Sequence, residues 1–324
     1  MGTHSRRKIG LAQLVALVAL ALVLRSAEAA PTPTPAPLSR PILWGHCKTT
    51  AITSTTTPPT IQRELQDMWD NGGRCVRIDN DWTDAIDAAH AVGFTNLVLV
   101  VGGTMRSVPE AATYASQAVA IAKAHPGAYI ELGNEPNLNG FSPAQYATIA
   151  RAAYKAIRDA GLSNTVLLGS VGNSLSTVGR YTMLEWCKQL VLNGCVRGEA
   201  FDWANYHIYG KPSVEEPWHH LFTPNKRGES CQTVLGNPPF AITEFGASLS
   251  KDCGGKESVQ AEYVNDWMQM FKGQPLFMLG TQYAMADEAP GSGTGYGLRR
   301  LDLSHRPSWN AFKRQATASP PPQP

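Results

Sequence analysis

The sequence predicts a single (β/α)8 TIM barrel, an α/β fold in which eight parallel strands alternate with helices. Short apolar segments alternate with amphipathic segments along the chain, which is typical of proteins with a parallel sheet. Residues 96–103 (NLVLVVGG) are apolar on both faces, as a strand covered on both sides must be. Eight strand-and-helix units can be counted, the number that closes a barrel. An open doubly wound sheet is the alternative, but it usually carries a glycine-rich loop after its first strand, where this chain reads WGHCKTT.

The expected elements follow one another in regular order. The strands are expected at residues 41–47, 74–79, 96–103, 128–135, 165–170, 202–209, 240–246 and 276–284. The helices are expected at residues 60–71, 83–92, 109–125, 143–160, 177–193, 258–272 and 307–316. A long irregular loop rich in Pro, Trp and His is expected at residues 210–239.

The two ends of the chain are expected to lie outside the catalytic domain, which spans residues 41–315. Residues 1–29 combine a basic start, an apolar stretch and a small-residue ending, which predicts a secretory signal peptide. An uncleaved membrane anchor is the alternative, but the apolar run is short for a bilayer core of ~30 Å. Residues 30–40 are rich in Pro and Thr and predict an extended linker, and residues 316–324 predict a disordered tail. We therefore expect a secreted protein, extracellular or periplasmic, with no membrane association after cleavage.

The composition narrows the classes of function. Hydrophobic residues make up 43% of the chain and charged residues 17%, so a large core can form. The formal net charge of +2 becomes −1 once residues 1–29 are removed. Nucleic-acid binding driven by positive charge is therefore not supported. A monomer is the default expectation.

Six cysteines suit an exported protein: Cys47, Cys75, Cys187, Cys195, Cys231 and Cys253. The pairs Cys187–Cys195 and Cys231–Cys253 close short loops and are the favoured disulfides. The other two cysteines are expected near opposite ends of neighbouring strands, which argues against a bridge between them. Neither a CxxC pair nor an HExxH helix is present, so no metal site is expected.

Two glutamates stand where predicted strands end. In AYIELGNEPN, period-two alternation places Glu131 and Glu135 on one face, and Pro136 biases Glu135 to an extended conformation. In FAITEFG, the same alternation places Phe240, Ile242 and Glu244 on one face. Catalytic residues of barrels lie at the carboxyl ends of the strands, so we expect both carboxylates at one rim.

Paired carboxylates suit the cleavage of a glycosidic bond. One group delivers a proton to the leaving oxygen, and the other attacks as a nucleophile or activates water. Their environments must keep one protonated and the other ionised. A surface or salt-bridged glutamate is the alternative for each, but here two glutamates end two strands.

These motifs resemble those of the clan A glycoside hydrolases, the superfamily that includes families 5 and 39. The resemblance rests on residues 131–137 (ELGNEPN), 242–246 (ITEFG) and 207–209 (HIY), with 295–298 (GYGL) and 306–309 (RPSW) near the end. It extends over nearly the whole folded region, from Trp44 to Phe312. No cofactor is implied.

The resemblance implies a role for each matching residue. Glu135 would be the general acid/base and Glu244 the nucleophile. The remaining matches would bind substrate or support the nucleophile: Asn134 on the sugar 2-hydroxyl, His207 and Tyr209 on the sugar or the nucleophile, and Arg77 on the nucleophile carboxylate. The alternatives are a core histidine for His207, simple packing for Tyr209, and an ion pair with Asp79 for Arg77.

Aromatic side chains could stack on the apolar faces of sugars. Trp44 and His46 share one face of the first strand, and Trp44 is the strongest stacking candidate, with ordinary packing as the alternative. The clan often has a Trp late in the eighth strand. Gln282 takes that position here, with Tyr283 beside it as a further candidate for substrate binding.

The sequence thus predicts a secreted retaining glycoside hydrolase that cleaves β-glycosidic bonds in a polysaccharide or glycoconjugate, with endo action favoured. A catalytically silent carbohydrate-binding barrel is one alternative, although both glutamates are present. A transglycosylase with the same pair is the other.

Overall fold

The computed structural model describes residues 42–47, 58–79, 82–172, 181–212, 218–287, 295–300, 302 and 304–318. The chain divides into two units, residues 1–38 and 39–324, and every described residue belongs to the second. The predicted signal peptide and linker lie outside the described residues. Residues 316 and 317, predicted to be disordered, instead complete the last helix.

Nine parallel strands form one sheet in the order β5-β4-β3-β2-β1-β9-β8-β7-β6. The strands are β1 (Leu43–Cys47), β2 (Cys75–Asp79), β3 (Asn96–Val100), β4 (Tyr129–Glu131), β5 (Val166–Leu167), β6 (Val171–Gly172), β7 (Ala204–Tyr209), β8 (Phe240–Gly246) and β9 (Phe277–Gln282). The two end strands, β5 and β6, are separated only by residues 168–170. β5 lies within the strand predicted at 165–170, and β6 directly follows it, so the two form one interrupted fifth strand that ends two residues later than predicted.

The sheet closes on itself through this interrupted fifth strand. Leu168 N donates to Trp203 O at 2.9 Å, and Asp202 N donates to Val166 O at 2.8 Å, so β5 also bonds to the segment that leads into β7. The eight predicted strands are therefore present, with the fifth in two pieces. The predicted (β/α)8 TIM barrel is confirmed.

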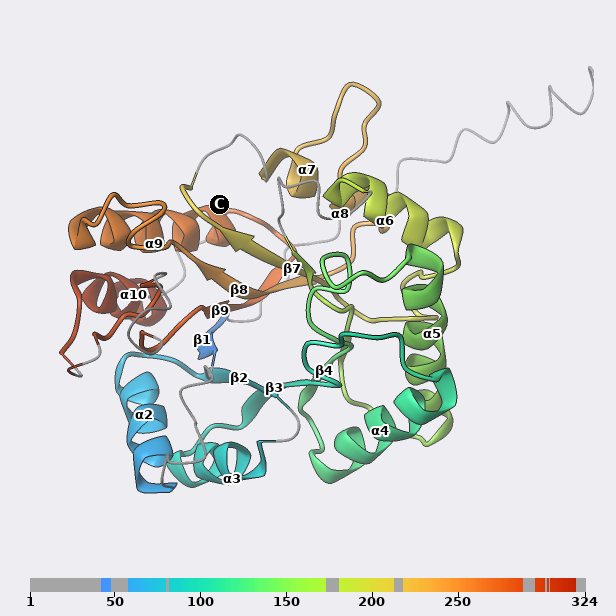
Figure 1. The fold of residues 1–324 in the computed structure, drawn as a ribbon, viewed down its shortest axis with the longest axis horizontal. Coiled ribbons are helices and arrows are strands. Elements are labelled where there is room, and N and C mark those ends of the chain that lie inside the picture. Colours follow the sequence, from blue (N-terminus) through green and yellow to red (C-terminus); the bar gives the residue numbers. More distant parts are fainter. Residues whose placement is uncertain are drawn as a thin grey trace, which may run out of the picture. The chain divides into compact units, whose positions relative to one another are not determined.

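Helices surround the strands (Figure 1). They are α2 (Pro58–Asp70), α3 (Thr83–Val92), α4 (Ala111–Ala124), α5 (Pro143–Asp159), α6 (Met183–Leu192), α9 (Glu257–Lys272) and α10 (Pro307–Thr317). The predicted loop at 210–239 also contains two short helices, α7 (Trp218–Phe222) and α8 (Cys231–Val234). No helix among the described residues is long and apolar enough to cross a bilayer.

Helix α5 shows how local sequence fixes the region around the site. Ser142 and Gln145 form a capping box that starts the helix. The first turn then buries Tyr146, whose hydroxyl donates to Leu132 O at 3.0 Å and accepts from Gly169 N at 2.6 Å. The phenol of Tyr146 thereby ties the end of β4 to the break in the fifth strand.

The barrel interior is layered. Its lower part is a small apolar cluster made of Cys75, Val98, Leu167, Ala241, Met278 and Leu279. Polar side chains lie nearer the carboxyl ends of the strands, all of them buried: Arg77, Glu131, Asn205, His207, Thr243 and Thr281. Buried polar groups need partners, so this upper layer is expected to form a hydrogen-bonded network.

The cysteine pairing differs from the prediction. All six cysteines are buried thiols, so neither favoured disulfide is present. Burial and the nearby thiol of Cys187 on α6 together raise the pKa of Cys231 on α8. The packing of two helices, rather than the shortest loop in the sequence, decides which thiols are neighbours.

Candidate active site

Glu135 follows β4 in an unusual backbone conformation. Its φ is +45°, in the left-handed region, and not extended as the following proline predicted. The surroundings hold this conformation, because Glu135 N donates to Ser170 Oγ at 3.1 Å and Asn139 Nδ2 donates to Glu135 O at 3.1 Å. The break in the fifth strand, which carries Ser170, thus helps to orient the carboxyl group.

Glu244 reaches the interior because β8 contains a β-bulge. Tyr206 pairs with Ile242 and His207 pairs with Glu244, so Thr243 is an extra residue on β8. The prediction that Phe240, Ile242 and Glu244 share a face is therefore wrong. Ile242, like Phe240, packs in the core with the helices, whereas Thr243 and Glu244 both contact residues of the barrel interior.

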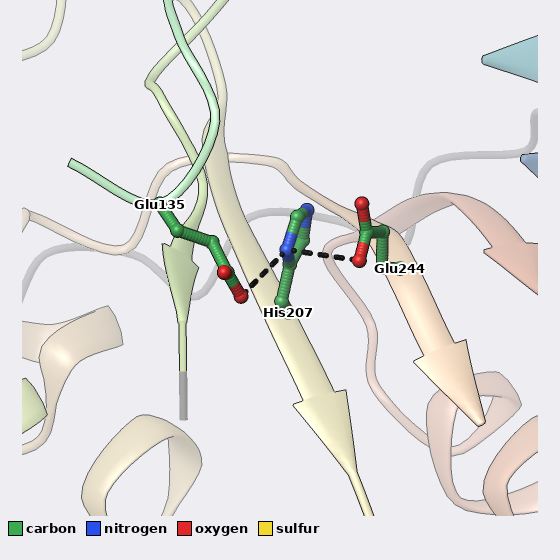
Figure 2. Close-up of side chains that lie close together, drawn as sticks. All are labelled: Glu135, His207 and Glu244. Atoms are coloured by element: carbon green, nitrogen blue, oxygen red, sulfur yellow. Dashed lines mark hydrogen bonds and ion pairs between the residues drawn. The ribbon is translucent and has the colours of Figure 1, made fainter. Parts of the chain in front are cut away.

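The two glutamates lie on either side of His207 (Figure 2). His207 Nδ1 is 3.1 Å from Glu135 Oε1 and 3.4 Å from Glu244 Oε2. Both carboxyl groups and the imidazole offer atoms that all lie within 4.8 Å of one another. The structure thus brings together the two carboxylates that the sequence placed at separate strand ends.

Arg77 links the supporting residues to this pair. Its Nε and Nη2 donate to both oxygens of Glu131 at 2.7 and 2.9 Å, and its Nη1 donates to Glu244 Oε1 at 2.7 Å. Nη2 also donates to Asn134 Oδ1 at 2.9 Å. Arg77 therefore has the contact expected from the resemblance. Its second ion-pair partner, Glu131, was named neither by the resemblance nor by the alternative, an ion pair with Asp79.

Tyr209 completes the surroundings of Glu244, because its hydroxyl donates to Glu244 Oε2. Its ring packs edge-on against Tyr283 and Tyr296 at centroid distances of 5.9 and 5.3 Å. All three tyrosines are partly exposed. Tyr296 belongs to the motif at residues 295–298, but the motif alone did not mark Tyr296 as a site residue.

Charges and burial shift the ionisation of these groups. Burial raises the pKa of the Glu135 carboxyl, but the hydrogen bond from His207 and the charges of His207 and Arg77 outweigh burial, so the net pKa lies below its ordinary value. Burial lowers the pKa of Arg77, but Glu131 and Glu244 overcome this and raise it. Burial and the charge of Glu244 raise the pKa of Tyr209, which keeps its hydroxyl a donor.

Trp44 and His46 do not join this group. Trp44 is 4% exposed and packs on Phe277 and Phe245 at 5.4 and 6.2 Å, and His46 is fully buried against Phe312 of α10 at 4.2 Å. The two residues do share a face, as predicted, but that face is covered by the helices. The structure therefore contradicts a stacking role for either ring.

Gln282 ends β9 and Tyr283 follows it, and the two side chains have different surroundings. The Gln282 side chain is fully buried and donates to the carbonyl oxygens of Tyr283 and Tyr296 at 2.8 and 3.3 Å. Gln282 therefore fixes the backbone of both tyrosines. The ring of Tyr283, which contacts Tyr209, lies at the edge of the site.

Glu135, His207 and Glu244 are also close enough to surround a metal ion. Arg77 and Tyr209, however, already donate to both oxygens of Glu244. A guanidinium 2.7 Å from one of these oxygens would repel a cation. The arrangement therefore fits proton transfer and nucleophilic attack better than metal binding.

Comparison with known proteins supports the fold. No family model and no curated protein matches the chain. Among solved structures, GH5_18 from Streptomyces cattleya in complex with GlcNAc aligns over 88% of this chain and 83% of its own, with a TM-score of 0.64 and 15% identity. A triple mutant of the endo-beta-1,4-glucanase from Xanthomonas axonopodis pv. citri aligns over 85% and 99%, with a TM-score of 0.58 and 16% identity.

A third match is longer than this chain. The FMN-binding beta-glucuronidase from Facaelibacterium prausnitzii L2-6 aligns over 86% of this chain but only 44% of its own, with a TM-score of 0.61 and 14% identity. At these identities the matches show that the chain has the barrel fold of these glycoside hydrolase structures. The activity has to be argued from the site.

Proposed function

We propose that the protein is a retaining glycoside hydrolase of the clan A type that cleaves β-glycosidic bonds. One observation carries the proposal: oxygens of Glu135 and Glu244 lie within 4.8 Å of each other inside the carboxyl end of the barrel. Retaining enzymes hold their two carboxyl groups ~5–5.5 Å apart, whereas inverting enzymes need ~6.5–9.5 Å to admit a water molecule.

The surroundings of each carboxyl suit a different role. Glu244 accepts hydrogen bonds from Arg77 and Tyr209, which orient it to attack the anomeric carbon. Glu135 is the more exposed of the two, with 23% of its side chain accessible against 11% for Glu244, and contacts His207. We assign Glu244 as the nucleophile and Glu135 as the general acid/base, with Asn134 placed by Arg77 to meet the sugar 2-hydroxyl.

The proposed substrate is a β-linked polysaccharide or glycoconjugate, which the enzyme cleaves at internal linkages of the glycan. The partly exposed tyrosines 209, 283 and 296 support it, because aromatic rings can contact the apolar faces of sugar rings. The structural neighbours include an endo-beta-1,4-glucanase and an enzyme in complex with GlcNAc. We further propose that residues 1–29 direct export, on the sequence pattern alone.

The test is hydrolysis of aryl β-glycosides and of a panel of glucans, mannans, xylans and arabinogalactans. Glu135→Gln and Glu244→Gln should each lower kcat by at least ~10²-fold, since general acid catalysis alone contributes that much. Glu199→Gln, an exposed carboxyl in the segment before β7, is the matched control and should leave turnover unchanged. If both site variants kept wild-type turnover, the assignment would be wrong.

Two measurements address the mechanism and the nucleophile. Proton NMR of the first product should show the β-anomer, as double displacement requires. A 2-deoxy-2-fluoro glycoside should label the peptide that contains Glu244. An α-anomer would exclude retention, and a label elsewhere would reassign the nucleophile.

A further inference from the structure

A chain of buried hydrogen bonds below the carboxylates has a fixed direction. Thr243 N and Thr243 Oγ1 both lie within hydrogen-bond distance of Asn205 Oδ1, at 3.3 and 2.9 Å. A backbone N–H can only donate, so the oxygen of the Asn205 amide must face Thr243. That oxygen can only accept, so the Thr243 hydroxyl must donate its hydrogen bond to Asn205 Oδ1.

This direction determines which nitrogen of His207 carries a proton. His207 Nε2 is 3.1 Å from Thr243 Oγ1. Because the hydroxyl proton is already directed to Asn205, only the lone pairs of Thr243 Oγ1 face the imidazole. His207 Nε2 must therefore donate to Thr243 Oγ1, so Nε2 carries a proton whenever the hydrogen bonds from His207 to Thr243 and from Thr243 to Asn205 are formed.

The other nitrogen then faces the catalytic pair. His207 Nδ1 lies 3.1 Å from Glu135 Oε1 and 3.4 Å from Glu244 Oε2. With Nε2 protonated, a neutral imidazole would turn the lone pair of Nδ1 toward two carboxylates. A proton between Nδ1 and Glu135 Oε1 removes this repulsion, whichever of the two atoms it is bonded to.

We propose that Thr243 and Asn205 are positioning residues that lock the His207 tautomer, so that Glu135 and His207 share the one proton used in acid/base catalysis. This inference rests on the proposed function. In the first step, the glycosidic C–O bond breaks, the bond from the anomeric carbon to Glu244 forms, and the shared proton passes through Glu135 to the leaving oxygen. In the second step, water attacks that carbon, its proton returns to the Glu135–His207 pair, and the Glu244 carboxylate is released.

The charged and titratable groups around the pair are consistent with one retained proton. They are Arg77 from β2, Glu131 from β4, Tyr209 from β7, Glu244 from β8, and Tyr296. Arg77 is already engaged by Glu131 and Glu244. Burial raises the pKa of Glu135, but its contact with His207 and the charge of Arg77 outweigh burial and hold this pKa below its ordinary value.

The sharing explains how a carboxyl with a lowered pKa can serve as an acid. Loss of the shared proton leaves the lone pair of His207 Nδ1 facing the Glu135 carboxylate, and the two repel each other. The Glu135–His207 pair therefore retains the proton to higher pH than Glu135 would alone. If His207 could change tautomer, Nδ1–H would hydrogen-bond to the Glu135 carboxylate without the extra proton. The pair would then lose its proton at lower pH.

The experiment removes the lock. Thr243→Val cannot accept from Nε2, so the alkaline limb of the kcat/KM profile should move down by about one pH unit, a tenfold weaker hold on the proton. Thr243→Ser keeps the hydroxyl and should restore the wild-type limb. Thr281→Val is the matched control, because it removes a neighbouring buried hydroxyl that donates to Thr243 O and not to His207.

A second variant and a second readout guard against a simple loss of folding. Asn205→Leu removes the acceptor and frees the Thr243 hydroxyl to donate to Nε2, so it should shift the limb in the same direction. Nitrogen-15 NMR of histidine-labelled protein above the alkaline limb, assigned with His207→Gln, should show the proton on Nε2 in the wild type and on Nδ1 in Thr243→Val.

The outcomes separate this inference from the proposed function. An unmoved limb in Thr243→Val, an equal shift in Thr281→Val, or Nδ1 protonation in the wild type would overturn the tautomer lock. A wild-type protein without glycosidase activity would instead defeat the proposed function. The NMR result would still report the tautomer in that case.

Discussion

Gly172 on β6 leaves the space that the Glu135 carboxyl occupies, and replacing Gly172 tests the geometry of the proposed general acid. A Cβ at this position would lie 2.6 Å from Glu135 Oε1 and 2.7 Å from Leu138 Cδ1. Ordinary contact begins at 3.4 Å, so the oxygen would have to withdraw by about 0.8 Å. The backbone of Gly172 cannot easily move instead, because Asn137 hydrogen-bonds to its N–H and its carbonyl at 2.9 and 3.0 Å.

A displacement of this size at a catalytic group costs about 10²-fold in rate, or about 2.7 kcal/mol of transition-state stabilisation. Gly172→Ala should therefore lower kcat/KM on unactivated β-glycosides by about that factor. The loss should be smaller on aryl glycosides with acidic leaving groups, which need little protonation. Stability should change by less than about 1 kcal/mol, because the displaced atoms are the ends of flexible side chains.

Gly273→Ala is the matched control, since its Cβ would meet no atom closer than 3.4 Å. Steady-state kinetics on substrates of graded leaving-group acidity, with urea unfolding of each variant, gives both quantities. Wild-type kcat/KM in a folded Gly172→Ala protein would show that the Glu135 carboxyl is not used where the structure places it. An equal loss on all leaving groups would assign it a role other than proton donation.

Two further predictions concern buried charge. Glu131→Gln should lower the free energy of unfolding by on the order of 3 kcal/mol, because it removes one partner of a buried ion pair with Arg77, and denaturant unfolding that shows no change would contradict the pairing. Burial lowers the pKa of His46 to about 3, below its value of 6.5 in the unfolded chain, so the unfolded state binds more protons between these values and stability falls as pH falls from about 6.5 to 3. His46→Leu should therefore remove about 3 kcal/mol of the stability lost between pH 7 and pH 4, and equal losses in both proteins would refute this assignment.

The position of Glu244 illustrates a feature that local sequence cannot show. Strict alternation along FAITEFG places Glu244 with Ile242, on a face that the helices cover. The bulge at Thr243 turns Glu244 into the barrel and at the same time places the Thr243 hydroxyl under His207. One extra residue thus supplies both the position of the proposed nucleophile and the proposed tautomer lock.

The first strand shows a different limit of sequence reasoning. Period two correctly groups Trp44 with His46, but it does not say which face of the strand points inward. Gly45 and Cys47 take the interior, where Cys47 Sγ approaches Thr243 O at 3.1 Å, and a Cβ on Gly45 would lie 1.9 Å from Cys75 O. The bulky pair is therefore left to pack against the helices.

The sequence by itself determined the alternation of strands and helices, hence the barrel, and the presence of two glutamates at strand ends. Both depend on patterns within a few neighbouring residues. Only the tertiary structure decided the break in the fifth strand, the bulge that redirects Glu244, and the ion pair of Arg77 with Glu131. These depend on how residues far apart in the chain share the limited space inside a closed barrel, which no local period encodes.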